Sequence, residues 1–121
     1  MADVKVKDER VYRPLVYICS PFSGDVVYNT QRAREFCRFA LDSGQIPLAP
    51  HLMFPQFMEE SVKEERELAL FMDIVLMGKC DEVWVLADRI SSGMQAEIEK
   101  ATKRHQKVRY FNGKFEEVVW A

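Results

Sequence analysis

One carboxylate in this sequence lies where it could act as a nucleophile. Glu97 follows an apolar segment (residues 81–88) and the stretch Ser-Ser-Gly-Met (residues 91–94), which is typical of a helix start. The positive end of a helix dipole and the free N–H groups there favour the ionised form of a nearby carboxylate. An ionised, fixed carboxylate can attack an electrophilic carbon or stabilise an oxocarbenium ion. The pattern leaves open the alternative that Glu97 only complements the helix dipole.

Two further carboxylates flank a helix-to-strand junction. Asp73 interrupts the apolar run LALFMDIVLMG, and Asp81 follows eight residues later. A carboxylate inside such a run must reach a partner or face a cavity, because burying it unpaired is costly. Carboxylates in different environments can divide the roles of nucleophile and general acid between them. For Asp81 the sequence also allows a purely local role, as a cap at the turn into the next strand.

The stretch SPFSGD (residues 20–25) is a candidate for holding the polar groups of a ligand. It offers two hydroxyls, a flexible glycine and the start of a helix, where backbone N–H groups can hold a phosphate. It matches neither GxGxxG nor a Walker loop, so a tight strand-to-helix connection is the alternative. His51 directly follows a strand segment and can hydrogen-bond a ligand. It has no Cys or His partner at metal spacing, so we predict no metal site.

The elements that must position these residues alternate between strand and helix. The sequence predicts strands at 15–19, 45–50, 81–88 and 107–111 and helices at 29–43, at 62–79 and from Ser92 onward, with 115–121 as a last strand or a short helix. Such alternation implies right-handed crossovers and a parallel sheet in an α/β fold. Parallel sheets bind ligands beyond the carboxyl ends of their strands. The loops 20–25, 50–54 and 87–94 are therefore where we expect a site, and Asp88 lies at its mouth.

Several local details are also predicted. Pro47 places its strand at an edge of the sheet or at a bulge. Ser92 is expected to be an N-cap, with Gln95 completing a capping box. The helix at 62–79 is expected to bury one stripe of large apolar side chains, formed by Leu68, Phe71, Met72, Val75 and Leu76.

Composition limits the class of protein. A chain of 121 residues fits a single domain, in which residues 1–12 read as a loose polar arm. The net charge of −2 argues against a nucleic-acid polymer as partner, because neutralising phosphates needs a basic surface. No apolar run approaches the ~20 residues that span a bilayer, and no signal peptide begins the chain. The three scattered cysteines suit small apolar side chains in a reducing cytoplasm, so we expect a cytoplasmic protein.

The order of these motifs resembles a known superfamily. The segments YICSPFSGD, WVLAD, SSGMQAEIEKA and KVRYF, with Asp73 eight residues before Asp81, are similar to the nucleoside 2-deoxyribosyltransferase-like superfamily. The closest resemblance, over residues 15–111, is to a small phage and bacterial branch beside the 2′-deoxynucleoside 5′-phosphate N-hydrolases. It implies a flavodoxin-like three-layer fold with a four- or five-stranded parallel sheet, assembled as a homodimer or larger homo-oligomer.

The resemblance also implies roles for individual residues. Glu97 would attack C1′ of the sugar and form a glycosyl-enzyme, while Asp73, together with Asp81, would lie near the nucleobase. No metal or redox cofactor is required. The remaining candidate substrate-binding residues lie at the ends of the strands and in the segments that follow them: Tyr17, Cys19, Ser20, Pro21, Phe22, Ser23, Gly24, His51, Asp88, Ser91, Ser92, Gly93 and Met94.

Two positions depart from the pattern of the superfamily. Many of its enzymes have glycine two residues before and two residues after the nucleophile, where this chain has Gln95 and Glu99. The leading hypothesis is cleavage or transfer of the N-glycosidic bond of a nucleoside or nucleotide. The alternatives are a non-catalytic protein that binds a nucleotide or an ADP-ribose-like ligand, and a module that serves only assembly.

Overall fold

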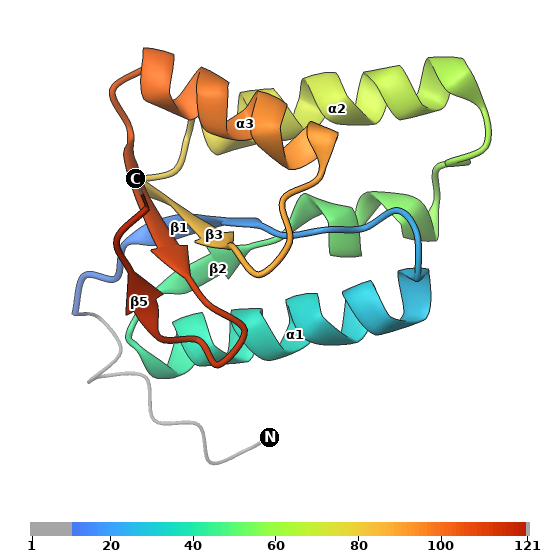
Figure 1. The fold of residues 1–121 in the computed structure, drawn as a ribbon. Helices are drawn as coiled ribbons and strands as arrows, with labels where there is room; N and C mark the ends of the chain where they lie inside the picture. Colours follow the sequence, from blue (N-terminus) through green and yellow to red (C-terminus); the bar gives the residue numbers. More distant parts are fainter. Residues whose placement is uncertain (1–10, 121) are drawn as a thin grey trace, which may run out of the picture.

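The fold is built on one five-stranded sheet (Figure 1). A computed structural model describes residues 11–120. The strands are β1 (Leu15–Cys19), β2 (Ile46–Leu48), β3 (Glu82–Leu86), β4 (Lys107–Phe111) and β5 (Glu117–Val118), in the order β2-β1-β3-β4-β5. The first four strands are parallel, and β5 runs antiparallel to β4. The sequence left the end of the chain open between strand and helix, and the structure decides for a strand.

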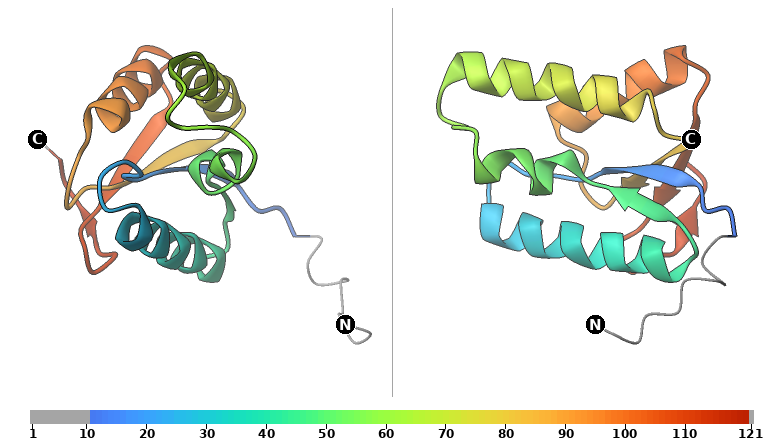
Figure 2. Two further views of the ribbon diagram at one scale, coloured as in Figure 1. Left: turned by 90° about the vertical axis from the view of Figure 1, so that its right-hand side faces the viewer. Right: turned by 180° about the vertical axis from the view of Figure 1, so that it is seen from behind.

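Helices cover both faces of the sheet. Helix α1 (Val26–Asp42) lies on one face, and α2 (Lys63–Met77) and α3 (Ser92–Lys103) lie side by side on the other (Figure 2). Two short 3₁₀ helices, η2 (Pro50–Leu52) and η3 (Phe54–Gln56), lie between β2 and α2. Three layers with this strand order make a flavodoxin-like fold, as predicted. Pro47 lies in the edge strand β2, where its missing N–H costs no ladder hydrogen bond.

Helix α1 begins earlier than expected, and the N-cap of α3 is not the predicted residue. Helix α1 begins at Val26 because the side chain of Asp25 accepts a hydrogen bond from the Tyr28 amide at 3.1 Å. Helix α3 has Ser91, and not Ser92, as its N-cap, since Ser91 is extended and its hydroxyl accepts from the Met94 amide at 3.2 Å. The expected capping box with Gln95 was therefore one residue out of register.

The central strands form the core and set which residues face which helices. Side chains alternate along β1, so Val16 and Ile18 pack against α1 while Tyr17 and Cys19 face α2 and α3. All four are essentially buried. On the α1 side Trp84 of β3 joins an aromatic cluster with Phe36, Phe39 and Phe111. The face toward α2 and α3 therefore carries the polar atoms that matter below.

Helix α2 is rotated relative to the sequence prediction. Leu68, Phe71 and Val75 are 49%, 65% and 42% exposed, so the predicted buried stripe was wrong. Met72 and Leu76 are only half-buried. The face turned toward the protein instead carries Ala69, Asp73, Ile74 and Met77. Both faces have apolar residues at helical spacing, so periodicity alone could not tell them apart.

Two of the three cysteines are buried, as the sequence predicted. All three cysteines are free thiols. Cys19 and Cys80 are buried as small apolar side chains, and Cys37 is half-buried. Within residues 11–120, no helix is both long enough and apolar enough to cross a membrane.

Candidate active site

A cavity of about 330 Å³ opens beyond the carboxyl ends of the central strands, on the side of α2 and α3. The loop after β1 contributes Ser20, Phe22 and Ser23, and the start of α3 contributes Ser91 to Met94. This is the place where open parallel sheets bind ligands, and the volume is in the range of small-molecule sites. The segments that line it are far apart along the chain and meet only through the fold.

Glu97 forms part of the cavity wall and is held by two donors from β1. Its side chain is 8% exposed. The Tyr17 hydroxyl donates to Oε2 at 2.5 Å, and the Cys19 thiol donates to Oε1 at 3.4 Å. Tyr17 and Cys19 are two residues apart on a strand, so both point to the face that α3 covers. Each oxygen of the carboxylate therefore has its own donor, and the carboxylate has a fixed orientation.

The ionisation of Glu97 is governed by burial rather than by the helix dipole. Glu97 is the sixth residue of α3, and the dipole effect fades beyond the first turn. Burial raises the pKa of Glu97, while the hydrogen bonds from Tyr17 and Cys19 act to lower it. Burial, reinforced by the Glu97 charge, also raises the pKa of Tyr17 and the pKa of Cys19, so both remain protonated donors. The sequence analysis expected the helix dipole to favour ionised Glu97. In the structure the pKa of Glu97 depends instead on the balance between burial and its two hydrogen bonds.

Asp73 faces the same cavity from α2. Its Oδ1 is buried and has no hydrogen-bond partner among residues 11–120. Burial, helped by the negative charges of Glu97 and Glu60, raises the pKa of Asp73 to about 7. Near neutral pH its carboxyl can therefore either donate or accept a proton, which is the property required of a general acid.

Ser20 and His51 form a hydrogen-bonded pair in the cavity wall. Ser20 Oγ lies 2.8 Å from His51 Nε2. Burial lowers the pKa of His51 to about 4, so the ring is neutral at pH 7 and can accept a hydrogen bond. Among residues 11–120, no group of three or more His, Cys, Asp or Glu side chains could hold a metal ion. The arrangement suits hydrogen bonding to a polar ligand.

A buried asparagine that the sequence analysis missed fixes the first loop. Asn29 is 4% exposed, and its Nδ2 donates to the carbonyls of Phe22 at 3.1 Å and Ser23 at 3.0 Å. These bonds tie the loop to α1. The signal was present in the sequence, since Asn29 lies four residues before Ala33 on the inner face of that helix.

The outer wall of the cavity is acidic and was also missed. Glu59, Glu60 and Glu65 line it, together with Arg66. The Arg66 guanidinium donates to the backbone carbonyl of Glu60 at 3.2 Å. Arg66 lies seven residues before Asp73 and on the same face of α2. The sequence could have indicated this shared face from the spacing. The segment before α2 has no periodicity, so no pattern predicted that it closes the cavity.

Not every predicted site residue reaches the cavity. Asp81 lies at the opposite end of the sheet, where its Oδ2 accepts hydrogen bonds from the Leu15 amide at 2.8 Å and the Tyr12 hydroxyl at 3.0 Å. It joins the starts of β1 and β3 through partners 66 and 69 residues away in sequence, which is a different role from the local turn cap that the sequence also allowed. It does not pair with Asp73 at a ligand.

Other predicted residues lie beside or beneath the cavity. Pro21 and Asp88 line a second, smaller hollow on the α1 side of the sheet. Gly24 has a φ of +102° and turns the chain into α1 without lining the cavity. Tyr17 and Cys19 lie beneath it and act on Glu97. The predicted residues that do line it are Ser20, Phe22, Ser23, His51, Asp73, Ser91, Ser92, Gly93, Met94 and Glu97.

The side chains at the two positions that depart from the superfamily pattern lie outside the cavity. Gln95 and Glu99 are both exposed, and neither lines the cavity. Side-chain bulk at position 95 therefore does not narrow the space in front of Glu97. The carboxylate of Glu99 points to solvent, where water screens its charge.

Comparisons with known proteins agree with this architecture. A family model described as a domain of unknown function, DUF7768, matches residues 14–111. No curated protein sequence matches the chain. The structure of a 2-deoxyribosyltransferase from the psychrotolerant bacterium Bacillus psychrosaccharolyticus is similar, with a TM-score of 0.61 and 18% sequence identity over 88% of this chain and 77% of that one. This similarity shows a shared fold.

Proposed function

The chain belongs to the DUF7768 family, and we propose that it cleaves or transfers the N-glycosidic bond of a nucleoside or nucleotide. The observation that carries the proposal is the position of Glu97, a buried carboxylate in a cavity wall with a separate donor on each oxygen. The structural similarity to a 2-deoxyribosyltransferase supports the same class of reaction. The acid–base character of Asp73, with a pKa of about 7, supplies the second group that such a reaction requires.

In the proposed mechanism Glu97 acts as nucleophile and Asp73 as general acid. The Glu97 carboxylate attacks C1′ of the sugar, and the bond from C1′ to the base nitrogen breaks with its electron pair going to the base. Protonated Asp73 gives its proton to the departing base. Water or a second base then attacks C1′ of the glycosyl-enzyme and frees Glu97, while the Asp73 carboxylate takes up the proton that the acceptor loses.

The rest of the cavity would hold the sugar. Ser20, His51 and Ser23 present hydrogen-bonding groups from the loops after β1 and β2. The first turn of α3, with Ser92 and Gly93, offers free backbone N–H groups to a hydroxyl or a phosphate. These groups line the same cavity as Glu97, so they suit a pentose whose anomeric carbon faces the carboxylate.

Release of free base tests the proposal. The purified protein is incubated with a mixed set of nucleosides and nucleotides, and free bases are separated by chromatography and identified by mass. We expect release by the wild type and none by Glu97→Ala. Glu99→Gln is the matched control, because it removes an exposed carboxylate from the same helix. Unchanged release by Glu97→Ala, or no release from any substrate by the wild type, would contradict the proposal.

One observation favours a second function, binding without cleavage. Burial raises the pKa of Glu97, and a protonated carboxyl is a poor nucleophile. The same cavity would then bind a nucleotide or an ADP-ribose-like ligand and release it intact. Recovery of the bound ligand unchanged after long incubation, with binding retained by Glu97→Gln, supports this second function and opposes the first.

A further inference from the structure

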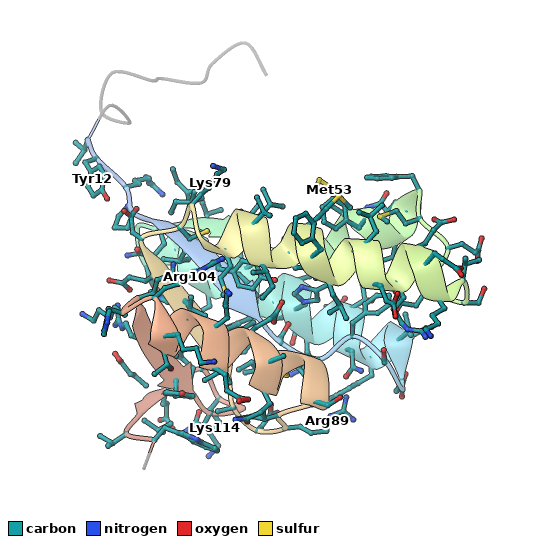
Figure 3. All side chains as sticks on the ribbon, turned by 90° about the horizontal axis from the view of Figure 1, so that it is seen from above. Tyr12, Met53, Lys79, Arg89, Arg104 and Lys114 are labelled. Atoms are coloured by element: carbon teal, nitrogen blue, oxygen red, sulfur yellow. The ribbon has the colours of Figure 1, made fainter. Side chains whose placement is uncertain are left out.

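A second hollow lies on the α1 side of the sheet, apart from the cavity that contains Glu97. Its volume is about 220 Å³, and residues from the end of β3, from the loop after β3 and from α1 line it. Figure 3 shows Arg89, which belongs to this lining, beside the beginning of α3, with Tyr12 at the opposite end of the molecule. The residues that line the hollow are different from those that line the cavity. The hollow is therefore a separate space at the carboxyl ends of the strands, where parallel sheets bind ligands.

Asn29 brings a largely buried acceptor to this hollow. The residue is 4% exposed and lines the hollow. Its Nδ2 donates to the carbonyls of Phe22 and Ser23, while its Oδ1 accepts from no donor among residues 11–120 and is not fully enclosed by them. Buried polar atoms in proteins find hydrogen-bond partners, so Oδ1 needs a donor from outside the chain. A hydroxyl group bound in the hollow would supply it.

Charged groups of both signs line the hollow. Two of them are the guanidinium groups of Arg32 and Arg89, and the third is the carboxylate of Asp88. Arg32 is held in place, because it pairs with Glu35 at 2.7 Å and donates to the Gly113 carbonyl at 2.5 Å. Arg89 and Asp88 are exposed, and neither forms a salt bridge with another of residues 11–120. The hollow therefore offers a cation and an acceptor that the described part of the chain leaves free.

We propose that this hollow is a binding site for a phosphorylated sugar of about the size of a pentose phosphate. Arg89, with the remaining N–H groups of Arg32, would hold the phosphate, whose three oxygens accept from several donors at once. The sugar hydroxyls would donate to the Asp88 carboxylate and to Oδ1 of Asn29. The volume lies below the roughly 300–1,000 Å³ of sites for drug-sized molecules, so the ligand must be compact.

The mixed charge of the lining selects this ligand over simpler ones. Bare phosphate has no sugar to donate to Asn29, and the Asp88 carboxylate repels it. A sugar without phosphate leaves the positive charge of Arg89 unused. A ligand that carries an anionic group and hydroxyl donors together satisfies both kinds of group in the hollow.

The hollow and the cavity share the loop after β1. Pro21 lines the hollow, while Ser20 and Phe22 on either side of it line the cavity. Asn29 would contact the ligand through Oδ1 and already holds the carbonyls of Phe22 and Ser23 through Nδ2. A bound sugar phosphate would therefore stiffen one wall of the cavity. The inference stands on the hollow alone and is independent of the reaction proposed above.

Binding measured by nitrogen-15 NMR tests the proposal without an assay of activity. Ribose 5-phosphate, inorganic phosphate and ribose are titrated separately into the labelled full chain, and dissociation constants are taken from the shifts of the amide signals. The side-chain amide of Asn29 and the backbone amide of Gly113, beside Asp88, report on the hollow, and Gly93 reports on the cavity. We expect ribose 5-phosphate to shift the signals of Asn29 and Gly113 and to bind about ten-fold more tightly than phosphate, and ribose to shift neither.

Two substitutions separate the phosphate contact from the hydroxyl contact. Arg89→Gln should weaken the binding of ribose 5-phosphate and of inorganic phosphate alike, by about ten-fold. Asp88→Ala should weaken the binding of ribose 5-phosphate, because a hydroxyl acceptor is lost, and tighten that of inorganic phosphate, because a repelling charge is lost. Arg34→Gln is the matched control, since Arg34 is an exposed arginine of α1 outside the lining, and it should leave every dissociation constant unchanged.

The same titrations can overturn the proposal. Shifts at Gly93 without shifts at Asn29 would place the ligand in the cavity instead of the hollow. Equal binding of ribose 5-phosphate and inorganic phosphate would show that the hydroxyl groups are not recognised. Binding that Arg89→Gln leaves unchanged, or the absence of any shift with ribose 5-phosphate, would overturn the site itself.

Discussion

Replacing Tyr17 by phenylalanine tests how the protein keeps Glu97 ready to react. The substitution removes one hydroxyl and leaves the ring, which fills the core between β1 and the helices. Oε2 of Glu97 then loses its 2.5 Å donor, while the 3.4 Å contact of Oε1 with the Cys19 thiol stays. Because burial already raises the pKa of Glu97, losing a donor must raise it further.

The size of this effect follows from the strength of the lost bond. A hydrogen bond to an ionised group contributes about 1.5–3 kcal/mol. Each pKa unit corresponds to about 1.4 kcal/mol, so the pKa of Glu97 should rise by about 1–2 units in Tyr17→Phe. At a pH well below the wild-type pKa of Glu97 the ionised fraction, and with it the rate of the proposed reaction, should fall by about 10- to 100-fold, and the fall should shrink as the pH rises toward the new pKa.

Carbon-13 NMR of the glutamate carboxyl carbons gives the measurement and needs no substrate. The Glu97 signal is assigned as the one that disappears in Glu97→Gln. Its chemical shift is then followed with pH, and the midpoint of this titration is compared between wild type and Tyr17→Phe. The unfolding free energy gives a second readout. The lost bond matters most when Glu97 is ionised, so the deficit in stability of Tyr17→Phe should grow as the pH rises through the pKa of Glu97.

The same titration can refute the reasoning. A Glu97 midpoint that stays unchanged or falls in Tyr17→Phe would mean that the hydroxyl does not stabilise the ionised carboxylate. Tyr28→Phe is the control, because Tyr28 is 57% exposed on α1 and lies on the other side of the sheet. It should leave the Glu97 midpoint and the unfolding free energy unchanged.

Two further substitutions test the neighbours of Glu97. Cys19→Ala should also raise the midpoint of the Glu97 titration in the same NMR experiment. Cys19→Ser keeps a hydrogen-bond donor and should leave the midpoint unchanged. Equal shifts in the two variants would show that packing, and not the thiol hydrogen bond, is responsible. Asp73→Asn should stabilise the protein at pH 8 and not at pH 4. The reason is that Asp73 has a folded pKa of about 7 and an ordinary value of 3.8, so its ionisation costs stability progressively between these values. After allowance for solvent screening, urea unfolding should show a gain of about 1–2 kcal/mol at pH 8, and no difference between the two pH values would argue against a raised pKa.

The architecture was predictable because its central strands carry a clear signal. Buried parallel strands read as continuous apolar runs: LVYIC matches β1 at its observed bounds, and the strand predicted at 81–88 contains β3 and extends past it at both ends. Helical spacing then implied the crossovers, and the crossovers implied a parallel sheet. The rule that ligands lie beyond the carboxyl ends led from the sheet to the loop at 20–25 and to the start of α3, both of which line the cavity.

The position of Asp81 could not be inferred from its spacing to Asp73. Eight residues are few, but β3 begins directly after Asp81 and runs for five residues toward the cavity. At about 3.3 Å per residue, the strand separates Asp81 from the carboxyl end of the sheet by roughly 16 Å. Direction along the strand, and not distance in sequence, decides which of the two carboxylates faces a ligand.

The rotation of α2 was undetermined for a different reason. Apolar residues occur on two faces of this helix, so the face that packs inward is chosen by the tertiary contacts. The structure turns Asp73 and Ala69 inward and leaves Phe71 and Val75 outside.

The surroundings of Glu97 explain how a buried carboxylate could favour the proposed reaction. Its two donors are neutral, and among residues 11–120 the one guanidinium that lines the cavity, Arg66, donates to a backbone carbonyl. The negative charge of ionised Glu97 is therefore poorly balanced by positive charge before the reaction. A positive charge that develops at C1′ would supply the missing compensation, and a site shielded from water strengthens that attraction. Stabilisation present mainly in the transition state is what accelerates a reaction, so burial would lower the barrier by the same physics that raises the pKa of Glu97.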